Sequence, residues 1–146
     1  MKRQDIREHL FRLLFRIEFN PMSDMNDQKR LYFEEPTRGD EDGLDIVTDN
    51  GDEEYIKDKY NRISEMLPQL DDIINKASKG WSTERMGKAD LTILRLAAYE
   101  VLFDDDIPTG VAIDQAVELA KKYGQDESAA FVNGILSGIS DLADKS

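Results

Sequence analysis

The first 16 residues combine basic and aromatic side chains at helical spacing. Arg3 and Arg7 lie one helical turn apart, and Phe11 and Phe15 continue along nearly the same side, with Arg12 beside them. Single-stranded RNA offers phosphates that cations neutralise and bases that stack on ring faces. The pattern is therefore typical of an RNA-binding edge, and this interpretation requires the arginines to be exposed.

A second interpretation of the same segment is purely structural. An apolar stripe at helical spacing runs through it, which predicts one buried helix face. The phenylalanines then widen this buried face, and the arginines form a solvated one. The stripe consists of Ile6, Leu10, Leu13, Leu14 and Ile17.

Most of the negative charge is concentrated in one segment. The chain has a net charge of −12, and residues 34–54 contain ten acids against one base. The remaining residues together carry only −3, whereas residues 1–16 contain five bases against two acids. Salt screens exposed charges over about 8 Å, so the local balance matters more than the total. The overall acidity therefore does not exclude an RNA partner.

Residues suited to catalysis or metal binding are scarce. His9 is the only histidine, and it lies among hydrophobic residues, so we expect it in a packing or surface role. The chain has no cysteine, which excludes thiolate chemistry and Cys-based zinc sites. Asp40, Asp42 and Asp45 lack the spacing of a calcium-binding EF-hand loop, and no glycine-rich phosphate-binding loop is present. We expect no catalytic residue, no metal and no cofactor.

The periodicity is helical throughout and predicts an all-α fold of six or seven helices in two small packed bundles. Asn50 or Asp52 is expected to cap the third helix, and Gly124 to end the sixth in the left-handed conformation. Lys79 and Gly80 end the fourth. The expected helices span about residues 4–18, 23–33, 53–67, 70–77, 88–103, 109–123 and 128–143.

The chain is expected to form a single domain over residues 1–146. Its N-terminal half covers 1–80 and contains an exposed, poorly ordered acidic loop at 34–51, rich in glycine and acids. Its C-terminal half covers 81–146. The sequence has no apolar run near the ~18 residues of a membrane span and no signal peptide, so we expect a cytoplasmic protein without a membrane partner.

Gly134 and Gly138 stand inside the last predicted helix, where each weakens the helix by about 1 kcal/mol relative to alanine. Four-residue spacing places both on one face. Two explanations stay open: close packing of another helix, or close approach of the backbone to a ligand.

Three segments in the last third resemble the closing helices of the bacterial transcription antitermination factor NusB family. They are Leu94–Glu100, Val111–Gly124 and Phe131–Leu136, in which Leu119-Ala120-Lys121-Lys122-Tyr123-Gly124 followed by Phe131-Val132-Asn133-Gly134 is the most specific combination. Arg7-Glu8 and Leu14-Phe15 resemble the family more faintly. The resemblance spans most of the chain and implies an all-helical fold without catalytic activity.

The resemblance also implies partners and site residues. Members of the NusB family pair with NusE, a small-subunit ribosomal protein, bind single-stranded box A RNA of ribosomal RNA transcripts, and act in the RNA polymerase antitermination complex. The positions implied for RNA are Lys2, Arg3, Arg7 and Arg12. The positions implied for NusE are Phe15, Asp90, Glu127 and Phe131.

Three polar and aromatic positions of the last third have alternative roles within the fold. Arg95 serves RNA or forms a buried ion pair. Phe131 and Asn133 belong to the core or, for Phe131, to the partner interface.

Two other functions fit the same sequence. One is a NusB-like RNA-binding appendage of an RNA cytosine methyltransferase, which requires a catalytic α/β domain after it. The other is a helical protein-interaction scaffold without RNA binding, for which the structural interpretation of the N-terminal arginines suffices.

Overall fold

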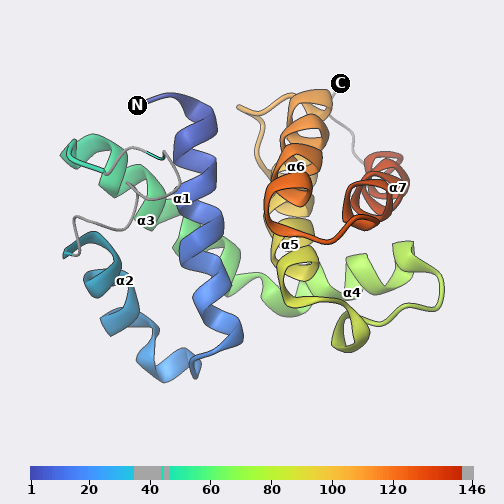
Figure 1. Cartoon of the computed structure of the whole chain (residues 1–146), viewed down its shortest axis with the longest axis horizontal. Helices are drawn as coiled ribbons and strands as arrows, with labels where there is room; N and C mark the ends of the chain where they lie inside the picture. The colour runs from blue at the N-terminus through green and yellow to red at the C-terminus, as the bar shows by residue number, and fades with distance from the viewer. Residues whose placement is uncertain (35–43, 45–46, 143–146) are drawn as a thin grey trace. The chain divides into compact units, whose positions relative to one another are not determined.

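The fold is that of a computed structural model, which describes residues 1–34, 44 and 47–142. Every regular element within these residues is helical, and seven are α-helices, which confirms the predicted all-α class. The α-helices are α1 Arg3–Phe15, α2 Met25–Glu34, α3 Asn50–Glu65, α4 Leu67–Ser78, α5 Lys88–Phe103, α6 Thr109–Tyr123 and α7 Ser128–Ser140 (Figure 1). Short 3-10 turns lie at Arg16–Glu18, Met22–Asp24 and Thr83–Arg85.

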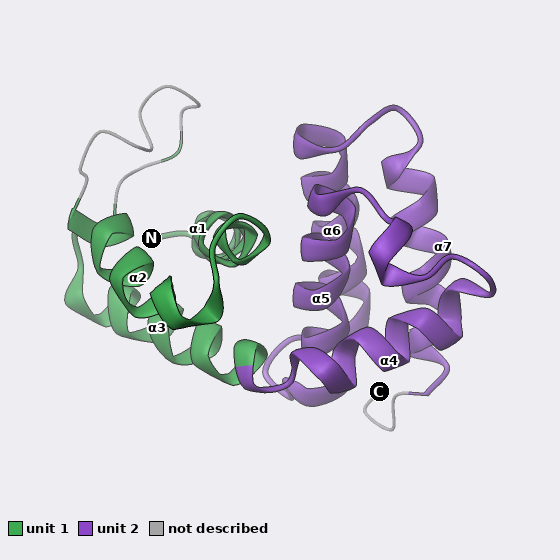
Figure 2. Cartoon of the chain, turned by 90° about the horizontal axis from the view of Figure 1, so that it is seen from below, with its two compact units in different colours: residues 1–64 green, residues 65–146 purple. Residues whose placement is uncertain are grey.

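The chain divides into two units, residues 1–64 with α1, α2 and α3, and residues 65–146 with α4 to α7 (Figure 2). The sequence placed the division later, between residues 80 and 81. The difference concerns α4, which packs against α5 and α7 of the C-terminal unit. Its apolar side chains Leu70 and Ile74 are fully buried, so α4 contributes to the C-terminal core.

In the N-terminal unit, α1 and α2 are joined by a buried hydrogen bond between His9 and Tyr32. The His9 Nδ1 and the Tyr32 hydroxyl oxygen lie 2.7 Å apart, and both side chains are buried. The two rings meet edge to face. A buried imidazole is stable here because its polar atom has a partner. The packing role predicted for His9 is confirmed.

The start of α3 differs from the prediction in its capping residue. The Asp49 carboxylate accepts hydrogen bonds from the backbone N–H groups of Gly51 and Asp52, at 2.6 and 3.1 Å. The predicted caps, Asn50 and Asp52, are wrong because the helix begins at Asn50, so Asp49 occupies the capping position.

The predicted acidic loop at 34–51 lies mostly outside the described residues. Leu44 is described and is only 4% exposed. The expectation of an exposed segment is therefore wrong at this residue, since an apolar side chain gains stability from burial.

Tyr60 of α3 carries a buried hydroxyl group. Its side chain is 2% exposed, and its hydroxyl has no hydrogen-bond partner among the described residues. The Lys29 ammonium lies over the ring, 5.4 Å from its centroid. Burial disfavours the phenolate and raises the pKa of Tyr60 to about 12.

This environment predicts an alkaline loss of stability that Tyr60→Phe removes. The unfolded chain releases the tyrosine proton near pH 10 and the folded chain only near pH 12, so the free energy of unfolding falls between these values, by about 2 kcal/mol. Urea denaturation at pH 7, 10 and 11.5 measures the difference between wild type and Tyr60→Phe. We expect the variant to be as stable as wild type or more stable at pH 7, and its advantage over wild type to grow above pH 10. A difference in free energy of unfolding between wild type and variant that does not change with pH would contradict the raised pKa.

In the C-terminal unit, α5 is the central helix and packs against α4, α6 and α7. It is buried almost all round, from Leu91 to Leu94 and from Leu96 to Val101. A helix that is buried on almost every side must be mostly apolar, and the sequence of α5 is, with Thr92 and Glu100 as its buried polar residues. Arg95 is the one residue between Leu91 and Val101 that is only partly buried.

Arg95 is held by a two-point ion pair with Asp71 of α4. Its Nε and one terminal nitrogen donate to the two carboxylate oxygens, each at 2.8 Å. Planar guanidinium and carboxylate groups match in this geometry, which makes the pair strong and directional. Of the two roles left open for Arg95, the structure shows the ion pair, and the residue joins α4 to α5.

The ends of α4 and α6 use glycine for different reasons. Lys79 has a φ of 51° and Gly80 a φ of 114°, so the predicted stop after α4 is confirmed. Gly124 has a φ of −95°, so the predicted left-handed conformation is wrong. A Cβ on Gly124 would lie 2.5 Å from the Ser128 side chain and 2.8 Å from the Ala120 carbonyl oxygen. Glycine is therefore needed for space at the corner between α6 and α7.

Candidate nucleic-acid interface

The structure offers few features of a catalytic or metal site. Asp, Glu and His side chains form no group of three or more suited to a metal ion within the part of the chain that is described. None of the helices in that part has the length and hydropathy of a membrane-spanning segment. The candidate surfaces are therefore those predicted for RNA and for a protein partner.

Lys2 and Arg3 are exposed at the beginning of α1. Lys2 is the capping residue, and its carbonyl oxygen accepts hydrogen bonds from the backbone of Asp5 and Ile6 at 3.0 and 3.1 Å. The N-terminus of a helix carries partial positive charge, to which these two side chains add. The α-amino group of Met1 is 3.5 Å from an Asp52 carboxylate oxygen, which ties the terminus to α3. This end of α1 can attract a phosphate.

Arg7 differs from the prediction because it is buried, with 6% of its surface exposed. Glu8, His9, Leu10 and Phe11 are buried as well, so α1 is covered on every side in its middle. The expectation of an exposed Arg7 is wrong. The helical period of the sequence identifies the most apolar face of α1. It does not show how much of the rest of the helix surface is buried by other parts of the protein.

The next two arginines take part in contacts within the N-terminal unit. Arg12 lies 3.4 Å from a Glu8 carboxylate oxygen, with 15% of its side chain exposed. Arg16 donates to the backbone and side-chain oxygens of Gln28, both at 3.1 Å, and its guanidinium lies over the Tyr32 ring. Arg16 thus joins the end of α1 to α2. Among the four residues predicted for RNA, Lys2 and Arg3 are the exposed ones.

The aromatic row that begins in α1 and ends just after the following 3-10 turn changes from buried to exposed along the chain. Phe11 is buried, Phe15 is partly buried and Phe19 is 61% exposed. Their rings are in contact, with centroids 5.7 Å apart for the first pair and 5.1 Å for the second. The row therefore divides into a core part and a surface part. Phe19 was not predicted as a site residue, although its four-residue spacing from Phe15 was visible in the sequence.

The other residues predicted for NusE lie in the C-terminal unit, on two helices that pack together. Asp90 is partly buried in the first turn of α5. Glu127 is exposed just before α7, and its carbonyl oxygen accepts a hydrogen bond from the Phe131 N–H at 3.1 Å. Phe131 is partly buried, between the core and surface roles predicted for it.

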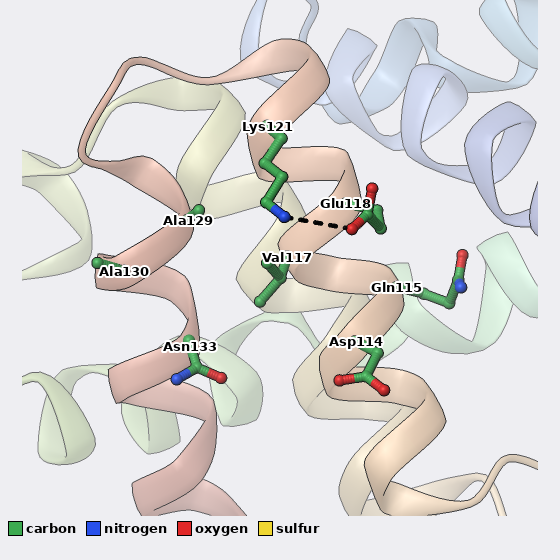
Figure 3. Close-up of a pocket in the computed structure, with 8 residues that line it drawn as sticks. All are labelled: Asp114, Gln115, Val117, Glu118, Lys121, Ala129, Ala130 and Asn133. Atoms are coloured by element: carbon green, nitrogen blue, oxygen red, sulfur yellow. Dashed lines mark hydrogen bonds and ion pairs between the residues drawn. The ribbon is translucent and has the colours of Figure 1, made fainter.

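A groove of about 600 Å³ lies between α6 and α7, and Figure 3 shows its lining. Asn133 is exposed and lines this groove from α7, so it does not belong to the core. Across from it lie Asp114 and Glu118 of α6, and the Lys121 ammonium is 3.4 Å from the Glu118 carboxylate. The lining is mixed polar and apolar, and its charges are partly neutralised within the groove.

Gly134 and Gly138 are exposed on α7. A Cβ added to either glycine would meet nothing within 4 Å. Close packing of another helix of this chain, one of the two explanations left open by the sequence, therefore does not account for them among the described residues.

The sequence of residues 4–141 matches the NusB family. It is 48% identical to the transcription antitermination protein NusB of Lachnoclostridium phytofermentans over 97% of this chain and 100% of that protein. It is 49% identical to that of Agathobacter rectalis over 94% of this chain and 98% of that protein. The chain belongs to the NusB family.

Solved NusB structures have the same fold. A structure of NusB from T. maritima superimposes on this chain with a TM-score of 0.79 at 36% sequence identity. The match covers 98% of this chain and 93% of that one. A crystal structure of the antitermination factors NusB and NusE in complex with double-stranded RNA gives a TM-score of 0.80 at 25% identity, covering 96% of each chain. The chain is therefore related over nearly its whole length to transcription antitermination proteins.

Proposed function

We propose that this member of the NusB family is a non-enzymatic antitermination factor that binds single-stranded box A RNA together with NusE. In ribosomal RNA operons, the pair holds the transcript near elongating RNA polymerase, where other factors modify the enzyme against termination. Such a factor acts in the cytoplasm. The observation that carries the proposal is the exposed cationic pair Lys2 and Arg3 at the positive end of α1. The related complex of NusB, NusE and double-stranded RNA supports it.

The proposed NusE surface consists of aromatic and acidic side chains. Phe15 has a partly exposed ring, and its contact with the exposed Phe19 enlarges the apolar surface available to a partner. Aromatic anchors of this kind carry much of the binding energy in protein interfaces. Asp90, Glu127 and Phe131 are the proposed contacts in the C-terminal unit.

Antitermination has more support than the other two functions considered. The matched region covers the full length of the L. phytofermentans antitermination protein, which favours that function over an appendage of an RNA methyltransferase. The exposed Lys2 and Arg3 favour RNA binding over a scaffold without RNA.

Titration of labelled box A RNA tests the RNA part of the proposal. We compare wild type with a Lys2→Gln/Arg3→Gln variant at 50 and 200 mM salt, with and without NusE. If these two cations neutralise two phosphates, the variant loses affinity at low salt. The slope of log K against log salt then becomes shallower by about 1.4, because each phosphate contact on a single strand contributes about 0.7.

Two further variants distinguish the RNA contact from a general effect of charge and from the contact with NusE. Arg30→Gln removes an exposed cation that is engaged with Asp27 and Glu34 on α2, and it should leave RNA binding unchanged. Glu127→Lys should reduce only the gain in affinity that NusE brings. Equal affinities and salt slopes for wild type and the Lys2→Gln/Arg3→Gln variant would refute the N-terminal RNA site.

A further inference from the structure

Trp81 presents an unusually exposed aromatic surface between α4 and α5. Its side chain is 52% exposed, and the Arg85 guanidinium lies 5.1 Å from the centre of its ring. Arg85 is exposed as well. A guanidinium over an indole face is a favourable contact that orients the ring. Since about half of the side chain is exposed, part of the indole surface remains available for a planar ligand.

The backbone around Trp81 is fixed by hydrogen bonds to α4. The Ser78 hydroxyl donates to the Trp81 carbonyl oxygen, and the Asn75 side-chain oxygen accepts from the Thr83 N–H at 2.7 Å. The 3-10 turn Thr83–Arg85 then places Arg85 beside the indole. A ring held in this way loses little conformational freedom when it binds a partner, which favours affinity.

The segment that carries Trp81 is electrically balanced, whereas the chain as a whole has a net charge of −12. Residues 71–90 contain four bases and four acids, and Asp71 is paired with Arg95. Lys76 is paired with Asp72 of the preceding turn, at 2.9 Å. Lys79 and Arg85 are exposed and form no ion pair with any residue that the structure describes. Arg85 over the exposed indole, with Lys79 two residues before Trp81 in the chain, suits a phosphate chain that carries bases.

We propose that Trp81, Arg85 and Lys79 form a second contact site for single-stranded RNA. A base stacks on the exposed part of the indole, and Lys79 and Arg85 neutralise the adjacent phosphates. The site lies wholly within the C-terminal unit and is separate from Lys2 and Arg3. The choice of ligand rests on the proposed RNA-binding function. RNA is favoured over a protein partner, because the exposed cations Lys79 and Arg85 accompany a single exposed aromatic ring in this segment.

Intrinsic fluorescence tests the proposal directly, since Trp81 is the only tryptophan in the chain. Stacking of a base on the indole quenches its emission, so any quenching reports on this residue. We titrate the full chain with box A RNA and follow tryptophan emission together with the anisotropy of a label on the RNA. We expect saturable quenching with the same midpoint as the anisotropy change.

Variants measure the contribution of the site. Trp81→Ala should weaken RNA binding by about fivefold or more, as loss of one stacked base predicts. Lys79→Gln/Arg85→Gln should weaken binding and reduce its salt dependence. Phe103→Ala, which removes another exposed aromatic ring of the C-terminal unit, should leave RNA affinity unchanged. Circular dichroism verifies that each variant is folded.

The outcomes separate this site from the proposed function. RNA binding by anisotropy without quenching, and with Trp81→Ala unaffected, would overturn the second site while leaving antitermination intact. If Trp81→Ala weakened binding of NusE but not of RNA, the segment would be a protein interface and the proposal would be wrong. If wild type bound no RNA with or without NusE, both the site and the proposed function would fail.

Discussion

Replacing Gly124 by alanine is expected to lower the free energy of unfolding by about 1–3 kcal/mol, which is the range for overpacking a closely packed site. The added Cβ would lie 2.5 Å from the Ser128 side chain and 2.8 Å from the Ala120 carbonyl oxygen. Ser128 cannot withdraw freely, because it is 2% exposed and its hydroxyl accepts a hydrogen bond from the Gln125 N–H at 2.9 Å. Relief of the clash must therefore open the corner between α6 and α7. Urea denaturation followed by circular dichroism measures the loss.

Gly134→Ala is the matched control, because the same methyl group is added ten residues further along the chain. That position is exposed within α7 and has nothing within 4 Å of the new Cβ. Alanine is the better helix former, so this variant should gain about 0.5–1 kcal/mol. Opposite signs for the two variants are the expected result. Equal stability of Gly124→Ala and wild type would show that the corner adjusts without strain.

The long helices were predictable because their sequences repeat the helical period over several turns. The predicted spans of α5 and α6, about 88–103 and 109–123, coincide with the observed Lys88–Phe103 and Thr109–Tyr123. The reason why position 124 requires glycine was not predictable. Its position after α6 is visible in the sequence, but its crowding by Ser128 depends on how α7 folds back, which is a property of packing.

The candidate site was predictable only in part for a similar reason. Lys2 and Arg3 are exposed as expected, since they lie at the terminus of the first helix. The pairing of Arg95 with Asp71 joins residues 24 positions apart on different helices, which local patterns do not reveal. The exposure of Trp81 could not be predicted from the sequence either. An aromatic residue between two helices with apolar faces is equally compatible with a position in the core.

Charge reversal at Arg7 is the second large expected effect. Arg7→Glu should lower the free energy of unfolding by about 3–5 kcal/mol, since the side chain is 6% exposed and a buried charge of the wrong sign is left without compensation. The neighbouring Glu8 is also buried and adds a like charge to that of the new carboxylate. Thermal and urea denaturation, each followed by circular dichroism, measure the change.

Arg3→Glu is the control on the same helix. Arg3 is exposed in the first turn of α1, where a carboxylate interacts favourably with the helix dipole, so its stability should change by no more than about 0.5 kcal/mol. Similar stabilities of the two variants would contradict the burial of Arg7. The contrast also governs how RNA-binding data are interpreted. Because Arg7→Glu is expected to disturb α1 itself, lost RNA affinity in that variant reports on folding, whereas lost affinity in folded Arg3→Glu reports on the contact with phosphate.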